Sequence, residues 1–318
     1  MLNPLDWMPT AHPQTLHKRA AIINKIREFF AQHNVLEVET PILGHATTTD
    51  PHIQSLSCVP MAGQPSLYLQ TSPEYHMKRL LAAGMGSIFQ ICKAFRAEEQ
   101  GSFHNPEFTL LEWYRIGFDH HNLMDEIEIL LRRILACAKA QRYTYQEIFI
   151  KYLQLDPLVV TVNDLKSLAI DNQLNDPGLW DDKDAWLMFL FSHLLEPQLQ
   201  NLTFVYNFPA GQASLARINT DDPRVVERFE VYFRGVELAN GFHELTHATE
   251  QRQRFHHDCL LRKKLGYPDI AIDEKLLQAL THGLPDCAGV ALGIDRLVML
   301  SLDLKSIADV VAFPFLRA

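Results

Sequence analysis

The stretch FRAEEQGSFHNPEFTLLEWYR, residues 95–115, decides the fold predicted for this chain. The residues that lead into it, SIFQICKAF at 87–95, are apolar and rich in strand-forming side chains. Gly101 and the Asn-Pro pair that follows interrupt the chain, and EFTLLEWYR at 107–115 then alternates, with Glu112 on one face. The pattern predicts a hairpin of two strands that carries more charge than a hairpin needs for folding.

The side chains on this hairpin have the chemistry of a nucleotide site. Arg96, together with Arg296 near the end of the chain, could clamp phosphate in a bidentate fork and stays charged at any relevant pH. Phe108 could stack on a flat ring, and Glu98 could accept a hydrogen bond from an exocyclic amine. The alternative is a ladder of surface ion pairs on an exposed hairpin, and the hairpin alone does not decide between the two.

A second cluster, RFEVYFRGVELANGFHEL at 228–245, carries paired carboxylates. Side chains alternate along a strand, so Glu230 and Glu237 share a face only if the chain turns between them, and Arg234-Gly235 supplies a turn. Two carboxylates that face a polyphosphate are a common way to hold Mg²⁺. A charged edge strand is the alternative. Glu244, placed just after a predicted turn at Asn240-Gly241, could bind a ligand ammonium or cap a helix.

The third cluster, GVALGIDR at 289–296, is a glycine-spaced strand that runs into a helix. Gly293 would let a ligand approach the backbone, and Arg296 would lie in the first turn of the helix that follows. The spacing is not GxGxxG, so tight packing of strand on helix is the favoured explanation of this segment when it is taken alone.

Composition excludes several classes of protein. The 318 residues are 47% hydrophobic and 21% charged, which is ordinary for a globular chain, and no apolar run is long enough to span a membrane. No signal peptide is visible, and the five cysteines form no CxxC pair, so we expect a reducing, cytoplasmic compartment and no zinc site. The net charge of −9 argues against a broad nucleic-acid-binding surface.

Periodicity elsewhere predicts helices and short strands that alternate irregularly. Helices are expected at 16–33, 73–83, 122–141, 163–171, 184–195, 248–265 and 273–282, and further strands at 35–40, 67–70, 202–209 and 228–241. Ser72 and Asn122 are the expected N-caps of two of these helices. The expected fold class is α+β, one domain over 1–318 with a mostly antiparallel sheet flanked by helices, and with a helical insertion at about 143–200 that shows no sign of chemistry.

Other residues that often carry chemistry form no persuasive pattern. His120-His121 and His256-His257 are neighbouring pairs, which do not share a face of a helix or strand, so a metal site is not expected there. No GxSxG motif is present, so serine hydrolysis is not supported.

The three clusters, in this order, resemble the three motifs of class II aminoacyl-tRNA synthetases. IREFFAQHNVLEVETPIL is similar to motif 1, residues 95–114 to motif 2 and GVALGIDRLVML to motif 3. SPEYHMKRLLAAG, HNPEFT and ELANGFHEL resemble lysyl-tRNA synthetase in particular. Motif 1 begins about 15 residues from the first residue, so the N-terminal OB-fold domain that reads the anticodon is expected to be missing. The chain therefore resembles the freestanding paralogues that attach (R)-β-lysine to elongation factor P.

The resemblance implies a role for each matching residue. It implies phosphate binding and catalysis by Arg96 and Arg296, and an Mg²⁺ site at Glu230 and Glu237. The remaining nucleotide contacts that it implies are Ala97, Glu98, His104, Asn105, Phe108, Leu238 and Gly293. The amino-acid pocket that it implies comprises Ser72, Pro73, Glu74, Glu112, Tyr114, Asn240, Glu244 and Ala291. Ser72 and Ala291 replace the Ala and Gly usual in lysyl-tRNA synthetases, and an added methyl could shift the preference between lysine isomers by roughly 1–3 kcal/mol.

The activity that the resemblance implies is ATP-dependent activation of (R)-β-lysine and transfer to a lysine ε-amine of elongation factor P, by a cytoplasmic homodimer built through motif 1. The alternatives are a truncated synthetase that acts on tRNA and a non-catalytic regulator that binds an amino acid. The predicted lack of an anticodon domain and the acidic charge balance make tRNA the weaker partner. Arg96, Glu237 and Arg296 are all present, which favours an enzyme over a regulator.

Overall fold

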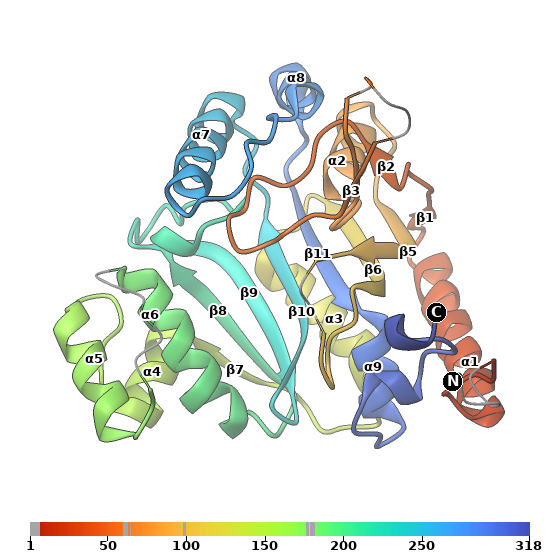
Figure 1. The fold of residues 1–318 in the computed structure, drawn as a ribbon, viewed down its shortest axis with the longest axis horizontal. Coiled ribbons are helices and arrows are strands. Elements are labelled where there is room, and N and C mark those ends of the chain that lie inside the picture. The colour runs from red at the N-terminus through yellow and green to blue at the C-terminus, as the bar shows by residue number, and fades with distance from the viewer. Residues whose placement is uncertain (1–6, 60–62, 64, 98–99, 176–177, 179–181) are drawn as a thin grey trace.

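An eight-stranded sheet forms the centre of the protein (Figure 1). The computed structural model describes residues 7–318 apart from 60–62, 64, 98–99, 176–177 and 179–181. The strands in spatial order are β1 (Leu36–Glu37), β5 (Ile88–Phe95), β6 (Glu107–Ile116), β11 (Cys287–Gly293), β10 (Val236–His243), β9 (Val225–Phe233), β8 (Thr203–Pro209) and β7 (Gln141–Thr144). The pairs β1–β5 and β7–β8 at the two edges are parallel and the pairs between them are antiparallel. The mostly antiparallel sheet predicted from the sequence is confirmed.

The predicted hairpin of the opening stretch is β5–β6, which lies in the sheet between the edge strand β1 and β11. Its register pairs Phe95 with Glu107 and Ile88 with Tyr114. The alternation in β6 sends Glu112 and Tyr114 toward a cavity on one face, whereas Trp113 packs in the core on the other. Period-two side-chain direction thus places acids and apolar rings of one strand on opposite sides.

Three helices cover the face of the sheet that lies away from the cavity: α1 (Pro13–Gln32), α3 (His120–Leu135) and α9 (Ile294–Ser301). In Figure 1, α3 lies behind the central strands. Asp119, not the predicted Asn122, is the N-cap of α3; Asn122 is the N3 residue that completes the capping box. The helix also ends earlier than predicted, because Ala136 takes the left-handed conformation and residues 141–144 join the sheet as β7.

The segment 143–200 holds α4 (Tyr145–Leu153), α5 (Val162–Asp171) and α6 (Lys183–Leu190), with a π-helical turn at Phe191–Leu195. These helices gather beside β7 and β8 in Figure 1 and build a second hydrophobic core against β8 and β9. No sign of chemistry is visible in the sequence of this segment, and the start of α6 contributes Asp182 and Asp184 to the lining of the cavity.

The third group of elements frames the opposite side of the cavity. It comprises α2 (Glu74–Ala82), α7 (Ala248–Lys264), α8 (Glu274–Gly283) and a small sheet of β2 (Leu43–Gly44), β4 (Leu67–Leu69) and β3 (Ser57–Cys58). The helix α2 begins one residue later than predicted, with Pro73 in the N-cap position and no side-chain cap bond from it. Ser72 still contributes, since its Oγ accepts the Glu74 N–H at 3.1 Å.

The last residues of the chain brace the loop between β5 and β6. The Ile307 N–H donates to the Ser102 carbonyl at 2.9 Å, and the Phe315 N–H donates to Asn105 Oδ1 at 2.9 Å. Thr10, near the start of the described chain, donates its hydroxyl to the Ala308 carbonyl at 2.9 Å. Segments from both ends of the sequence thus meet beside this loop.

Candidate active site

A cavity of about 740 Å³ lies on the open face of the sheet, between α2, α6, α7 and the loop after β5. Glu98 lies outside the described residues. The other residues predicted for the site line this cavity, except Pro73 and Ala97, which do not: the lining includes Ser72, Glu74, Arg96, His104, Asn105, Phe108, Glu112, Tyr114, Glu230, Glu237, Leu238, Asn240, Glu244, Ala291, Gly293 and Arg296. Three separate sequence clusters therefore meet on one wall.

Glu112 forms the centre of the end of the cavity predicted to take the amino acid. The side chain is 2% exposed and accepts hydrogen bonds from Ser72 Oγ at 2.6 Å and from the Tyr114 hydroxyl at 2.8 Å. Burial and the nearby Glu74 raise the pKa of Glu112 to about 8, against the lowering effect of the two hydroxyls. A cation bound beside Glu112 would favour the ionised form of this carboxyl.

Lys78 is a member of this pocket that the sequence reading missed. The ammonium lies 2.7 Å from Glu74 Oε1 and 2.6 Å from Glu244 Oε2, and the side chain is 1% exposed. Burial alone would lower the pKa of Lys78, but Glu244 and Glu74 raise it well above its usual value. The available signal was a lysine four residues after Glu74 and beside Met77 on the buried face of α2.

The formal charge of the pocket follows from these four groups. Glu74, Glu112 and Glu244 contribute three negative charges and Lys78 contributes one positive charge, which leaves two negative charges when all three acids are ionised. Burial and Glu74 raise the pKa of Glu244 to about 7, although Lys78 acts in the other direction. A ligand with two ammonium groups would favour the ionised forms of these acids and release any protons that they hold.

Two glycines in neighbouring strands make room for this arrangement. A Cβ on Gly289 of β11 would lie 2.2 Å from Tyr114 Cε1 and 2.6 Å from Glu244 Oε1. Gly241 is similar, since a Cβ there would lie 2.4 Å from Phe229 Cζ. The turn predicted at Asn240-Gly241 is wrong: both residues lie inside β10, and the glycine is needed for packing rather than for a turn. Both positions exclude any larger side chain.

Arg296 links the elements at the other end of the cavity. Its guanidinium donates to the Phe103 carbonyl at 3.1 Å and to the Glu237 carbonyl at 2.9 Å, and lies 2.7 Å from His104 Nε2. Its side chain is also within 3.6 Å of the Glu237 carboxylate. Arg296, which borders the cavity, thereby connects the helix α9, the loop after β5 and the strand β10.

The aromatic and amide side chains of the hairpin already have partners. The Arg96 guanidinium lies 5.1 Å from the centre of the Phe108 ring, a cation–π contact. Asn105 donates to the Glu107 carbonyl at 2.6 Å and accepts from the Phe315 N–H, so its amide holds the loop in place. Contact between these residues and a nucleotide stays a prediction.

Asp295, which was not predicted for the site, joins α1 to the cavity wall. It is 3% exposed, accepts the Thr109 N–H at 2.8 Å and forms an ion pair of 2.6 Å with Arg19. Arg19 also donates to Thr109 Oγ1 at 2.9 Å. The position after Gly293 and before Arg296 was visible in the sequence, but its partner lies far away in the chain.

Two carboxylates predicted to hold metal lie on adjoining strands. Glu230 in β9 accepts bonds from Arg228 and from the Tyr232 hydroxyl, and Glu237 in β10 faces Arg296. Burial raises the pKa of Glu230, with Arg228 opposing and Glu237 adding to the rise. A third acid, Glu196, was missed; burial and the charges of Glu237 and Glu230 raise its pKa to about 7. The negative charges of Glu196, Glu230 and Glu237 repel one another, so a bound cation would stabilise this group of acids.

Comparison with known proteins identifies the family. The profile of the family described as tRNA synthetases class II (D, K and N) matches residues 3–317. The chain belongs to this class II synthetase family. The expectations of an α+β fold and of a synthetase-like catalytic domain are confirmed.

Curated relatives within this family are similar over their full length. A protein of Vibrio cholerae is 54% identical over an alignment of 320 positions, which covers 98% of this chain and 99% of the relative. Proteins of Salmonella typhi and Hamiltonella defensa are 52% and 50% identical, with 100% of each chain covered. All three are named elongation factor P–(R)-β-lysine ligase. Within the described part of the chain, no helix combines the length and apolarity needed to cross a bilayer.

Proposed function

We propose that this class II synthetase-like chain is a ligase that activates (R)-β-lysine with ATP and transfers it to a lysine ε-amine of elongation factor P. The observation that carries the proposal is the charge of the buried pocket. Glu74, Glu112 and Glu244 less Lys78 leave two negative charges, which match the two ammonium groups of a diamino acid. The names of the relatives at 50–54% identity supply the acceptor and the isomer.

Adenylate formation needs no general base in this site. The amino-acid carboxylate is already a nucleophile, so catalysis consists of placing it in line with the α-phosphorus and of stabilising charge there. Arg96 and Arg296 border the cavity away from Lys78 and its two acidic partners, Glu74 and Glu244. These two arginines would hold the phosphates. Phe108, half-buried beside Arg96, would stack on adenine.

Mg²⁺ is the metal that the acids near Arg296 would hold. Glu230 and Glu237 are hard oxygen donors, both line the cavity, and their charges repel one another. The oxygens of Glu230 already accept one bond each, but a carboxylate oxygen can accept a second partner. The residues therefore fit Mg²⁺, which would neutralise the phosphate charge when bound.

The transfer step requires a neutral amine from the acceptor. A lysine of ordinary pKa, about 10.4, is mostly protonated at neutral pH and must lose a proton before it attacks. Asp182 and Asp184 at the start of α6 line the same cavity and would attract such a cationic side chain. The helical segment around 143–200 would in this way assist acceptor binding within a single domain of residues 1–318.

The quaternary structure that we infer is a homodimer through motif 1. The strand β1 lies at an edge of the sheet, and Leu36, Ile42 and Leu43 near it are 52%, 42% and 46% exposed. Apolar side chains beside an open strand edge favour association with a second chain. Light scattering at micromolar concentration measures the mass, and a monomer would contradict this inference.

The cysteines form no disulfide, which supports a cytoplasmic location.

Pyrophosphate exchange and acyl transfer test the proposed activity. ATP–pyrophosphate exchange should be fastest with (R)-β-lysine, when α-lysine and both β-lysine enantiomers are compared. The adenylate should then label elongation factor P, but not a variant in which the modified lysine is replaced by arginine. Exchange with none of the lysine isomers would contradict enzyme function altogether. Transfer to tRNA alone would instead support a truncated synthetase.

A further inference from the structure

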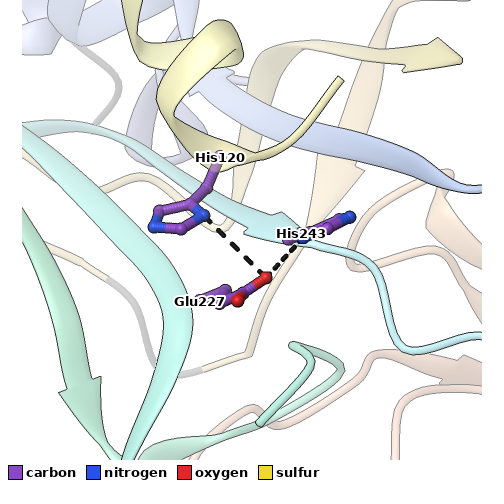
Figure 2. Close-up of side chains that lie close together, drawn as sticks. All are labelled: His120, Glu227 and His243. Atoms are coloured by element: carbon purple, nitrogen blue, oxygen red, sulfur yellow. Dashed lines mark hydrogen bonds and ion pairs between the residues drawn. The ribbon is translucent and has the colours of Figure 1, made fainter. Parts of the chain in front are cut away.

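Three buried side chains from distant parts of the sequence meet next to the amino-acid pocket, outside the cavity. His120 begins α3, Glu227 lies in β9 and His243 ends β10. Figure 2 shows both imidazoles turned toward the Glu227 carboxylate, and one ligating atom of each residue lies within 4.8 Å of the others. His243 is followed directly by Glu244, so adjacent residues of the chain serve the cluster and the pocket.

His120 lacks the hydrogen bonds that a buried histidine usually makes. It is 4% exposed, and within the described part of the chain neither ring nitrogen has a hydrogen-bond partner. Nδ1 points at Glu227 Oε2 from 4.0 Å, too far for a hydrogen bond. Most buried polar groups have a hydrogen-bond partner, and a bound ion or water explains many of the exceptions.

His243 has the surroundings of a metal-ligating histidine. Its Nδ1 is bonded to Glu227 Oε2, and its Nε2 lies 3.0 Å from Asp286 Oδ1. Ligating imidazoles commonly give their second ring N–H to a carboxylate, which fixes the tautomer and the ring orientation. Asp286 is in turn held by Arg217 at 2.6 Å, and Arg217 also donates to the Glu244 carbonyl at 3.2 Å.

We propose that His120, Glu227 and His243 bind a Zn²⁺ ion through Nδ1 of each imidazole and one carboxylate oxygen, with Asp286 as the outer partner of His243. Two imidazoles and a carboxylate form a donor set suited to Zn²⁺ and poorly suited to Mg²⁺. Ligand distances of about 2.0–2.1 Å around a tetrahedral ion require ligand atoms roughly 3.4 Å apart. To admit the ion, His120 Nδ1, now 4.0 Å from Glu227 Oε2, must move closer, and His243 Nδ1, now hydrogen-bonded to that oxygen, must move away from it. Water can take the fourth position.

Binding exchanges a proton for the ion. The proton now shared between Glu227 and His243 leaves for solvent, and the freed lone pair of His243 Nδ1 binds the ion. The ion then ties the start of α3 to β9 and β10, one residue away from Glu244. The site is structural: it would stabilise the strand that carries a wall of the amino-acid pocket. This inference does not rest on the proposed function.

Zinc titration of the full chain tests the proposal. After removal of metal with a chelator, the protein should bind one Zn²⁺ per chain, with a rise in melting temperature. Co²⁺ in its place should give the intense visible absorption of a tetrahedral site. His120→Ala should lose the site, and Asp286→Asn should bind about 10–100-fold more weakly. His17→Ala, which removes an exposed histidine of α1, is the matched control and should bind like the parent.

The proposal is overturned if the parent chain binds no Zn²⁺ at micromolar free metal, or if His120→Ala still binds one ion with unchanged affinity. Circular dichroism of the metal-free variants shows whether each one folds. If His120→Ala does not fold, His120→Gln, which keeps the size and polarity of the side chain, replaces it. Zinc binding by a folded His120→Gln variant at parental affinity would equally refute the site.

Discussion

The two ends of the cavity are built on different principles. At the end predicted to take the amino acid, Lys78 and Glu244 have side chains that are each 1% exposed and form an ion pair of 2.6 Å. At the end predicted to take the nucleotide, the side chains of Arg296 and Glu237 are 21% and 37% exposed. Charges in the buried end interact strongly and shift one another's pKa values, whereas those in the open end are partly screened by water.

Because of this difference, we expect substitutions at the two ends of the cavity to have different effects. Removing a buried charge at the first end should alter stability, because it leaves an oppositely charged side chain buried without its partner. The guanidinium of Arg296 is better solvated, so its removal should cost less in folding than the removal of Lys78. Changes at the first end should therefore act mainly on stability, and changes at the second mainly on rate.

Arg296→Ala should give the largest effect, mainly on rate. Loss of a phosphate-binding arginine removes transition-state stabilisation worth about 10³-fold or more. We expect pyrophosphate exchange to fall by at least that factor, and the unfolding free energy to fall by about 1–3 kcal/mol through loss of the bonds to the Phe103 and Glu237 carbonyls. Arg252→Ala, which removes an exposed arginine paired with Glu274 at 2.6 Å, is the control. Near-normal exchange in Arg296→Ala would show that the phosphate assignment is wrong.

Lys78→Met should act mainly on stability. It leaves Glu74 and Glu244 without their buried cation, and such breaks cost about 3–5 kcal/mol. Urea unfolding measures the loss. Lys93→Met is the matched control, because Lys93 and Glu107 form an exposed pair of 3.1 Å that should contribute less than about 1 kcal/mol. Equal stability of the two variants would contradict the comparison, and adding Glu244→Gln to Lys78→Met should restore part of the loss.

Glu112→Gln should reveal the proton held in the empty pocket. The folded-state pKa of Glu112 is about 8, above the unfolded value of about 4.3. The folded chain therefore binds this proton more tightly, and the resulting stability is lost as pH rises through 8. Relative to Glu112→Gln, the parent should lose about 1–3 kcal/mol between pH 6 and 9 without substrate.

Urea unfolding at several pH values checks this result. Glu107→Gln, an exposed acid at the start of the same strand, should follow the parent at every pH. Saturating β-lysine should reduce the loss, since its ammonium groups favour the ionised carboxyl. A parallel pH profile for the parent and Glu112→Gln would mean that Glu112 titrates normally.

The sequence predicted the sheet and the lining of the cavity well, because both depend on local patterns. Alternation in residues 107–115 placed Glu112 toward the cavity, and Arg234-Gly235 marked the turn between β9 and β10, where both residues have positive φ angles. Helix ends were less accurate: the α3 N-cap was assigned three residues late, because Asn122 and Asp119 are both good capping residues and bond reciprocally.

Contacts between distant segments could not be predicted from such patterns. Lys78 reads as one more polar residue on a helix until Glu244 is brought to it by β10. His120 was dismissed because its neighbour His121 could not share its face, yet its partners come from β9 and β10. Gly289 reads as packing until the Tyr114 ring and a carboxylate are found over it. The cluster at His120 and the role of α6 depend in the same way on tertiary structure.

The brace between the C-terminal segment and the loop after β5 has a practical consequence. Ser102 and Asn105 are held by the backbone of residues 307 and 315, so the loop that carries His104 takes its position from the final turn of the chain. We expect an affinity tag or fusion partner joined near residue 318 to disturb these two hydrogen bonds and, with them, the position of the loop that carries His104. Protein prepared for kinetics is better tagged elsewhere.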